Sequence, residues 1–495
     1  MLRYFFILFL VIGYFPSRIT FGKPMATEGS ALAQKGRSSV IGQPNNVTIK
    51  GKTDSTYLFE AGTIYAYTYD DHISYREKEL SKSLLDAKGN FSLNFSVSET
   101  TDIFLIVDNA KAEMVVEPDK TYNIIFSAKD SNAVNTLSST NPVEIVFAYM
   151  GNDELNFLIS DFSSRYETML EDYRGNIARK ESVIFKKIDT LETLFKKKYA
   201  AFNNLYLDNY IYYTFASLDE NITLENKENV YKKHIAGRPI LLNNPDYMAF
   251  FNQFYSVTAS YFMSNSKMIS EVNSKQNFSS IMEFFKQSKL LINDTIRETV
   301  MLKSLAEYFR YPEYKAAAVL AILDQAAKHC KTPENRKAAE NLKRKLSVMV
   351  EGKPAPPISF KDMEGETVSL ADLKGKYVYL NFWTTFCSPC TQDMTLIPGL
   401  KKTYGGKIVF VSISLDKKPE AVKNFLKKPP QLSPEQSGSG WIFLHADNYK
   451  KVKEEFNVLT VPAYYLIDSK GNVLRSPAPK PADIELELMN IKKKK

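Results

Sequence analysis

Two cysteines, Cys387 and Cys390, lie three residues apart in a Cys-Ser-Pro-Cys motif. The run before them, Tyr377 to Trp383, is rich in aromatic and β-branched residues, which predicts a buried central strand, and the residues after Cys390 predict a helix. A cysteine in the first turn of a helix faces unpaired backbone N–H groups and the positive end of the helix dipole. Both favour thiolate over thiol, so this placement indicates a redox-active dithiol.

The order of the two cysteines predicts different roles for them. Cys387 is the candidate nucleophile, because it stands at the start of the helix. Cys390 lies one helical turn further on, where it can attack a mixed disulfide and release the reduced product, so it is the candidate resolving thiol. Pro389 fits between them, since proline is tolerated in the first helical turn.

Zinc binding and an inert structural disulfide are the alternatives for this pair. A zinc site needs two more ligands with suitable spacing, but the third cysteine, Cys330, is distant in sequence and the four histidines are scattered. Cys330 ends a predicted helix and is interpreted as a small buried apolar residue. The pair is therefore expected to cycle between dithiol and disulfide, a reaction that requires no metal and no organic cofactor.

The length of 495 residues predicts two or three domains. The formal net charge of +8 is modest, and the lysines are spread along the chain apart from a tail at 492–495. Nucleic-acid binding needs a basic face with interleaved aromatic residues, and the sequence has none, so nucleic acid is not expected as a partner.

The N-terminus has the pattern of an export signal. Arg3 precedes an apolar run from Tyr4 to Phe15, which has the length of a signal-peptide core and is short for a membrane span. We expect residues 1–22 to be a signal peptide, with small residues near Thr20 and Gly22 at the cleavage site; an uncleaved membrane anchor is the alternative. No cysteine follows the run, so a lipoprotein anchor is not indicated.

Between the signal and the dithiol, the pattern changes twice. Short alternating segments separated by turns predict an antiparallel β domain, a sandwich or barrel, at 46–128. Apolar residues at helical spacing predict an all-α region at 141–350, including one long helix with a stripe from Ile184 to Tyr210 that is interpreted as core. Further helices are predicted at 297–309, 313–328 and 333–349.

A proline-rich segment, 351–357, cannot continue a helix and marks the last boundary. Beyond it, strands and helices alternate, which predicts an α/β domain at 352–491 with both faces of its sheet covered. The predicted elements are a strand at 377–383, a helix after Cys387, a strand at 408–414, a helix at 419–427, a helix at 449–456 and a hairpin at 468–472.

Four motifs of this last domain occur together in a known family. They are Gly352-Lys353-Pro354-Ala355-Pro356, Asn381-Phe382-Trp383-Thr384-Thr385-Phe386-Cys387-Ser388-Pro389-Cys390, Val409-Phe410-Val411-Ser412-Ile413-Ser414-Leu415-Asp416 and Val461-Pro462-Ala463-Tyr464-Tyr465-Leu466-Ile467-Asp468. On these motifs the domain resembles the TlpA/ResA-like branch of the thioredoxin family, whose members are membrane-facing or periplasmic thiol-disulfide oxidoreductases. The N-terminal regions resemble, more weakly, those attached to such domains in some Gram-negative envelope proteins.

The resemblance implies further site residues. It implies that Pro462 is a cis proline lying against the dithiol, so that the backbone of Val461 can pair with an extended substrate segment. Trp383 and Phe386 are expected to belong to the substrate-binding surface, Phe386 standing where the family usually has tryptophan. An ordinary trans proline is the alternative for Pro462.

The resemblance also locates the groups that move protons. Asp393 stands where the family usually has a glutamate near the sulfurs, and an acid there can accept a proton as Cys390 deprotonates. The alternative is a solvated acid in the first turn of the helix. Asn381 occupies the position of a buried aspartate in thioredoxins, so the strand lacks that acceptor.

The leading hypothesis is a periplasmic disulfide reductase whose substrate is a disulfide-bonded envelope protein and whose dithiol is restored by a membrane thiol electron donor. An oxidase or isomerase would use the same residues. A thiol peroxidase is an alternative, because Thr384 precedes Cys387 by three residues as in peroxiredoxins, although Leu380 stands where those enzymes have proline. A different class is an envelope scaffold protein with a vestigial dithiol.

Overall fold

The structure is a computed structural model that describes most of the chain. The described residues are 45–53, 62–107, 110–128, 141–147, 151–179, 182–222, 227–357, 359–416, 418–427, 440–446, 452, 455–456, 458 and 460–493. The predicted signal peptide, residues 1–22, lies outside them. Within these residues, no helix combines the length and the apolar character that crossing a membrane requires. The chain forms two compact units, of which the second contains residues 308–324 and the chain from 340 onward.

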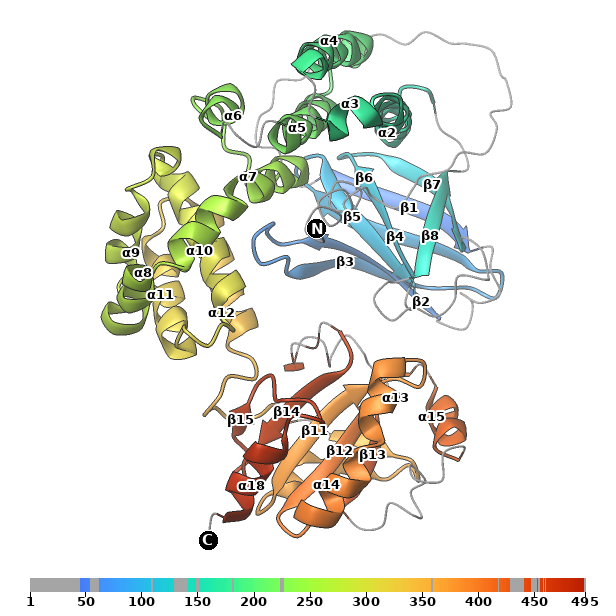
Figure 1. Cartoon of the computed structure of the whole chain (residues 1–495). Coiled ribbons are helices and arrows are strands. Elements are labelled where there is room, and N and C mark those ends of the chain that lie inside the picture. The colour runs from blue at the N-terminus through green and yellow to red at the C-terminus, as the bar shows by residue number, and fades with distance from the viewer. Residues whose placement is uncertain are drawn as a thin grey trace. The chain divides into compact units, whose positions relative to one another are not determined.

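The first unit begins with an eight-stranded sheet (Figure 1), in the order β3-β2-β5-β6-β8-β7-β1-β4. Its strands are β1 (Asn45–Thr53), β2 (Thr63–Tyr69), β3 (Glu77–Leu84), β4 (Asn90–Val97), β5 (Thr101–Val107), β6 (Ala110–Val116), β7 (Thr121–Ala128) and β8 (Asn141–Phe147). Alternate residues are buried, as in β4, where Phe91, Leu93, Phe95 and Val97 join one core.

The predicted antiparallel β domain is therefore present, with two differences. The pairs β1–β7 and β6–β8 are parallel. The sheet also continues past the predicted limit at residue 128, because β8 pairs with β7. The sequence at 141–147 is short and follows a polar stretch, so its assignment to the sheet depends on tertiary pairing and not on local pattern.

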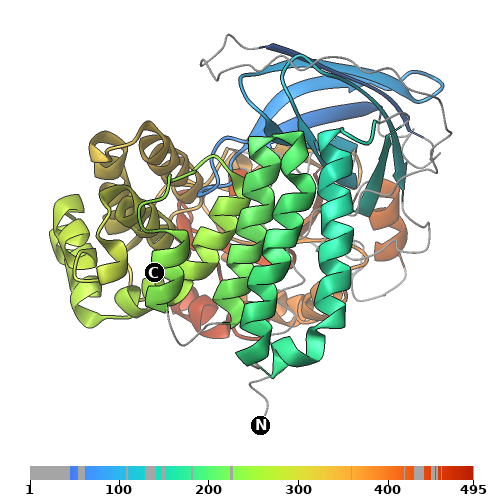
Figure 2. The ribbon, with the colours of Figure 1, turned by 90° about the horizontal axis from the view of Figure 1, so that it is seen from above.

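Helices follow the sheet. They are α2 (Leu155–Asp172), α3 (Arg174–Ala178), α4 (Ser182–Tyr199), η1 (Ala200–Phe202), α5 (Leu205–Ile222), α6 (Lys227–His234), α7 (Pro245–Met263), α8 (Ser266–Ser270), η2 (Glu271–Lys275), α9 (Phe278–Phe285), η3 (Lys289–Leu291), α10 (Asp294–Tyr308), α11 (Ala316–His329) and α12 (Pro333–Leu346). Helices α2, α4 and α7 all contact α5, and Figure 2 shows these four helices side by side.

The prediction of one long helix from Ile184 to Tyr210 is wrong. The chain breaks after η1, where Asn203 adopts a left-handed conformation with φ of 46°. Asn204 then starts α5, because its side-chain oxygen accepts the N–H of Leu207 at 3.1 Å. Two asparagines thus end one helix and begin the next, and the apolar stripe runs over two packed helices. The three later helices, α10 to α12, lie where they were predicted.

The C-terminal domain has a seven-stranded sheet in the order β10-β9-β13-β12-β11-β14-β15. Its elements are β9 (Ser359–Asp362), β10 (Thr367–Ser369), η4 (Leu370–Leu373), β11 (Tyr377–Trp383), α13 (Ser388–Met394), α14 (Ile397–Tyr404), β12 (Ile408–Ser414), α15 (Pro419–Leu426), β13 (Trp441–His445), β14 (Ala463–Ile467), β15 (Val473–Arg475) and α18 (Glu485–Lys493). Most of the predicted helix at 449–456 lies outside the described residues.

The central strands β11 and β12 are buried almost throughout, because both faces of the sheet are covered. Tyr379 and Trp383 belong to the core on the α13 face, whereas Leu380 and Phe382 belong to the core on the opposite face. β11 pairs in parallel with β12 and antiparallel with β14. The end of β11 is therefore a rigid base for the residues that follow it.

Candidate active site

The two cysteines form a disulfide where β11 leads into α13, with their Cα atoms 5.2 Å apart. Cys387 is the N-cap of α13, which begins at Ser388, directly after Cys387 as predicted. The backbone N–H of Cys390 donates to Cys387 Sγ at 3.2 Å. Cys387 keeps 5% of its surface exposed and Cys390 keeps none. Cys387, the less buried of the two, is thus the cysteine whose sulfur faces the N–H groups at the start of the helix.

A buried carboxylate at the end of β12 holds the loop that leads into Cys387. Asp416 accepts the backbone N–H of Thr385 at 3.0 Å and the Thr385 hydroxyl at 2.6 Å. The Ser414 hydroxyl donates to the same carboxylate at 2.7 Å, and His445 Nε2 donates to the Asp416 carbonyl at 2.7 Å. These bonds fix the loop between β11 and the cysteines from β12 and β13.

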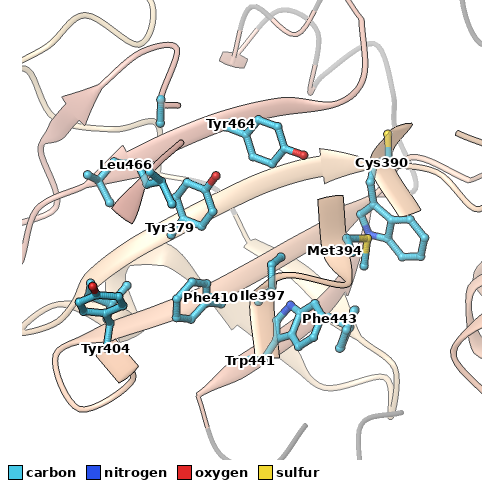
Figure 3. Packing of buried hydrophobic residues seen from close by; sticks show 14 of the residues in the cluster. Tyr379, Cys390, Met394, Ile397, Tyr404, Phe410, Trp441, Phe443, Tyr464 and Leu466 are labelled. Atoms are coloured by element: carbon cyan, nitrogen blue, oxygen red, sulfur yellow. The ribbon is translucent and has the colours of Figure 1, made fainter. Parts of the chain in front are cut away.

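An acid lies one helical turn beyond Cys390. Asp393 is half-buried on α13, and its Oδ2 accepts the hydroxyl of Tyr464 on β14 at 2.7 Å. Burial, with the neighbouring Asp393 carboxylate, raises the pKa of Tyr464 well above its ordinary value, so the hydroxyl remains a donor. Figure 3 shows the rings of Tyr464 and Tyr379 next to each other; they stack with centroids 5.8 Å apart, and the Tyr379 hydroxyl donates to the carbonyl of Pro479.

A neutral amide lies on β11, the strand that leads to the dithiol. Asn381 is buried on β11, and its Oδ1 accepts the Ser412 hydroxyl at 2.6 Å. Ser412 in turn accepts Trp441 Nε1 at 2.9 Å. The Asn381 Nδ2 atom is buried and has no hydrogen-bond partner among the described residues. Asn381 cannot take up a proton in the thiol range, so its contribution here is packing and hydrogen bonding.

The C-terminal domain is similar to known proteins. The family model Redoxin matches residues 350–485. Thioredoxin-like protein YneN of Bacillus subtilis is 36% identical over 124 residues, which are 24% of this chain and 67% of YneN. Thiol-disulfide oxidoreductase ResA of Bacillus thuringiensis is 33% identical over 125 residues, which are 25% of this chain and 67% of ResA. The chain belongs to the TlpA/ResA-like thioredoxin family. It is an oxidoreductase of the thiol-disulfide class.

Solved structures similar to the chain include the thioredoxin domain of a thiol-disulfide oxidoreductase from Bacteroides vulgatus. The identity is 24%, the match covers 29% of this chain and 97% of that chain, and the TM-score is 0.26. A thioredoxin-like protein from Bacteroides caccae matches over 48% of this chain and 84% of that chain, with 17% identity and a TM-score of 0.36.

The cis proline that the family resemblance implied is present. The Val461–Pro462 peptide bond is cis. Val461 is partly buried against the core that contains both cysteines, and Phe386 keeps 47% of its surface exposed next to Cys387. These positions are compatible with a substrate-binding role for Val461 and Phe386, which stays a prediction.

Trp383 does not fit its predicted role. Its side chain is fully buried in the core that contains the cysteines, because it is the last inward-facing residue of β11. It therefore supports the dithiol and has no surface for a substrate to touch. Thr384, on which the peroxidase alternative depends, is also buried, and its hydroxyl makes no hydrogen bond within the described residues. That alternative gains no support from the geometry.

Two residues of the site have no role in the sequence-based hypothesis. Asp416 and Tyr464 both lie inside motifs that carried the family resemblance, but nothing in their spacing from the cysteines points to a contact. The sequence does contain one signal for Asp416: it is a charged residue that closely follows the apolar run of β12. A charge in such a position is expected to be buried and therefore to need hydrogen-bonding partners. Within the described residues, no group of three or more histidine, cysteine, aspartate or glutamate side chains is arranged to hold a metal ion.

Proposed function

We propose that the protein is exported to the periplasm and reduces disulfide bonds of envelope proteins. One observation carries this proposal: Cys387 Sγ accepts the Cys390 N–H, and Cys387 keeps 5% of its surface exposed whereas Cys390 keeps none. In the reduced protein the same N–H would stabilise a Cys387 thiolate. The proposed direction, reduction, follows the family resemblance, and export follows the apolar run near the N-terminus.

The reaction has two exchange steps. The Cys387 thiolate attacks one sulfur of the substrate disulfide, a bond forms between Cys387 and that sulfur, and the other substrate sulfur leaves as a thiolate. Cys390 then loses its proton and attacks Cys387 Sγ, which releases the second substrate thiolate and leaves the Cys387–Cys390 disulfide. The substrate gains two electrons and the dithiol loses two. A membrane thiol donor would return them by the same exchange in reverse.

The proton of Cys390 needs an acceptor in the second step. Asp393 lies one turn further along α13, so its carboxylate is close in the helix to the resolving thiol. The Tyr464 hydroxyl binds one of its two oxygens, which fixes the side chain and leaves the other oxygen free of that bond. Asn381 cannot fill this role because it is a neutral amide.

A trapping experiment tests the proposal. In a Cys330→Ala background, Cys390→Ser removes the resolving thiol, so Cys387 should remain bound to its substrate as a mixed disulfide. Covalent partners are separated without reductant and identified by mass spectrometry. The control is the variant that also carries Cys387→Ser, which should trap nothing.

The outcomes separate the functions. Disulfide-bonded envelope proteins trapped through Cys387 would support the proposal. Recovery of no covalent partner, from a variant whose wild type reduces disulfides normally, would contradict the assignment of the two thiols. Peroxide consumption by Cys390→Ser with external thiol, at the wild-type rate, would favour the peroxidase. Full cellular function of Cys387→Ser would favour a scaffold protein with a vestigial dithiol.

A further inference from the structure

The first compact unit contains a cavity of about 200 Å³ that is separate from the dithiol domain. It lies between the β2–β3 connection and helices α7 and α10. Its lining residues are His72, Ile73, Tyr75, Asn252, Lys303, Ala306 and Glu307. Drug-sized ligands occupy cavities of roughly 300 to 1,000 Å³, so this one has the size for a small metabolite.

The β2–β3 connection contributes the rings of His72 and Tyr75 to the wall of this cavity. The Asp71 carboxylate accepts the N–H groups of Ile73 at 2.9 Å and Ser74 at 2.6 Å, which closes the turn. Tyr75 follows with φ of 52°, a conformation that a tyrosine rarely adopts, and its N–H donates to the Asp71 carbonyl at 3.2 Å. The Tyr75 hydroxyl accepts a hydrogen bond from Nδ2 of Asn252 on α7 at 3.2 Å.

The amide of Asn252 leaves one polar atom without a partner. Its Oδ1 is buried and accepts no hydrogen bond from the described residues. This oxygen has almost no accessible surface, so a ligand in the cavity does not reach it. The Asn252 amide contributes by donating to the Tyr75 hydroxyl, which holds that ring at the cavity wall.

Two opposite charges line the same cavity. Lys303 Nζ lies 3.3 Å from Glu307 Oε1 on α10. The Lys303 side chain is largely buried, so its ammonium is poorly solvated. This burial lowers the pKa of Lys303 below its ordinary value. It carries three donors, and Glu307 occupies one of them. Burial also lowers the pKa of His72, which therefore adds a neutral ring to the wall.

We propose that this cavity binds a free amino acid with an apolar side chain. The carboxylate of the ligand pairs with Lys303, and its ammonium pairs with Glu307. The two charged groups of an amino acid are attached to one carbon, and the two charges of the protein lie side by side on α10. Each charge of the ligand can therefore face the opposite charge of the protein. Ile73, Ala306 and the rings of Tyr75 and His72 leave an apolar space for its side chain.

Calorimetric titration of the full chain with L-leucine and L-phenylalanine tests this proposal. The single-charge probes are 4-methylpentanoate, which lacks the ammonium, and 3-methylbutylamine, which lacks the carboxylate. We expect at least one of the two amino acids to bind and to raise the unfolding temperature. Each single-charge probe should bind at least about tenfold more weakly, because one pairing is lost.

Variants locate the site. Lys303→Met and Glu307→Gln should each weaken binding by about tenfold or more. Glu307 is about half exposed, so its variant is expected to fold even if the lysine variant does not. The matched control is the exposed pair Lys286 and Glu283 at the end of α9, 3.5 Å apart, where Lys286→Met and Glu283→Gln should leave binding unchanged.

Three results would overturn the proposal. They are no binding of either amino acid at about 10 mM, equal binding of a single-charge probe, and unchanged binding in the Glu307→Gln variant. The cavity would then hold water alone or serve another ligand class. None of these results bears on the dithiol chemistry, which depends on the other unit.

Discussion

The carboxylate of Asp416 should be a main support of the loop that carries Cys387. The side chain is only 4% exposed, and three donors end on it: the Thr385 N–H, the Thr385 hydroxyl and the Ser414 hydroxyl. Hydrogen bonds to a charged group contribute about 1.5 to 3 kcal/mol each. Since the contributions are not additive and the buried charge itself costs desolvation, we expect Asp416→Ala to lower the free energy of unfolding of this domain by about 2 to 4 kcal/mol.

The chain provides its own probe for this measurement. Its two tryptophans, Trp383 and Trp441, are both buried in the core beneath α13, so tryptophan fluorescence in urea reports on this domain. With a urea dependence of about 2 kcal/mol per molar, the midpoint should fall by about 1 to 2 M. Reduction of a model disulfide should slow by about tenfold, because a loosened loop misplaces Cys387.

Two further variants make the test specific. Thr385→Val keeps the shape and the backbone N–H but removes one hydroxyl that donates to the carboxylate, so it should cost about 1.5 to 3 kcal/mol. Asp483→Ala changes an exposed aspartate of the same domain and should have no effect. If Asp416→Ala unfolds at the same urea concentration as Asp483→Ala, the carboxylate does not hold the loop and the reasoning is refuted.

Three other predictions concern separate parts of the chain. Burial raises the pKa of Asp102 to about 6. The stability of the first unit that is present below about pH 4 is therefore lost as the pH rises from 4 to 6. Asp102→Asn, which still accepts the Tyr206 hydroxyl, should stabilise this unit at pH 7.5 by about 1 to 2 kcal/mol, given the partial exposure of the side chain. Calorimetry should show no such gain at pH 3.5. Tyr464→Phe should slow the resolving step by about tenfold in stopped-flow disulfide exchange, because Asp393 loses its fixed orientation, while the first attack keeps its rate. Burial raises the pKa of the Cys330 thiol far above its ordinary value, so mass spectrometry after alkylation of the reduced native protein should find Cys387 labelled and Cys330 unlabelled.

The elements that are rich in local signal were predictable from the sequence. β11 and β12 begin and end at the predicted residues, because a continuous apolar run between polar residues and turns is typical of a strand buried on both faces. The break at Asn203 was missed, since the apolar stripe keeps its spacing across the junction and hides the change of helix. Strand β8 was missed because a polar stretch of sequence separates it from β7, with which it pairs.

The same distinction applies to the site. Cys387 and Cys390 are neighbours on one helix turn, and sequence spacing was enough to pair them. Trp383 was misassigned because alternation along a strand tells which residues share a face but not whether that face is covered. Asp416 and Tyr464 reach the site from β12 and β14, and such contacts depend on the order of strands in the sheet, which local pattern does not give.

Strand order also connects substrate binding to proton transfer. β14 lies beside β11, and it begins directly after Pro462, where the family resemblance predicts that the substrate backbone docks. Two residues later the same strand carries Tyr464, whose hydroxyl holds Asp393. A substrate that pairs with Val461 therefore contacts the start of the strand that also positions the acid next to the resolving thiol. With a neutral Asn381 on β11, the proposed proton acceptor, Asp393, comes from the helix and is bound by Tyr464 of β14, so changes at Tyr464 should act on the release of product more than on the first attack.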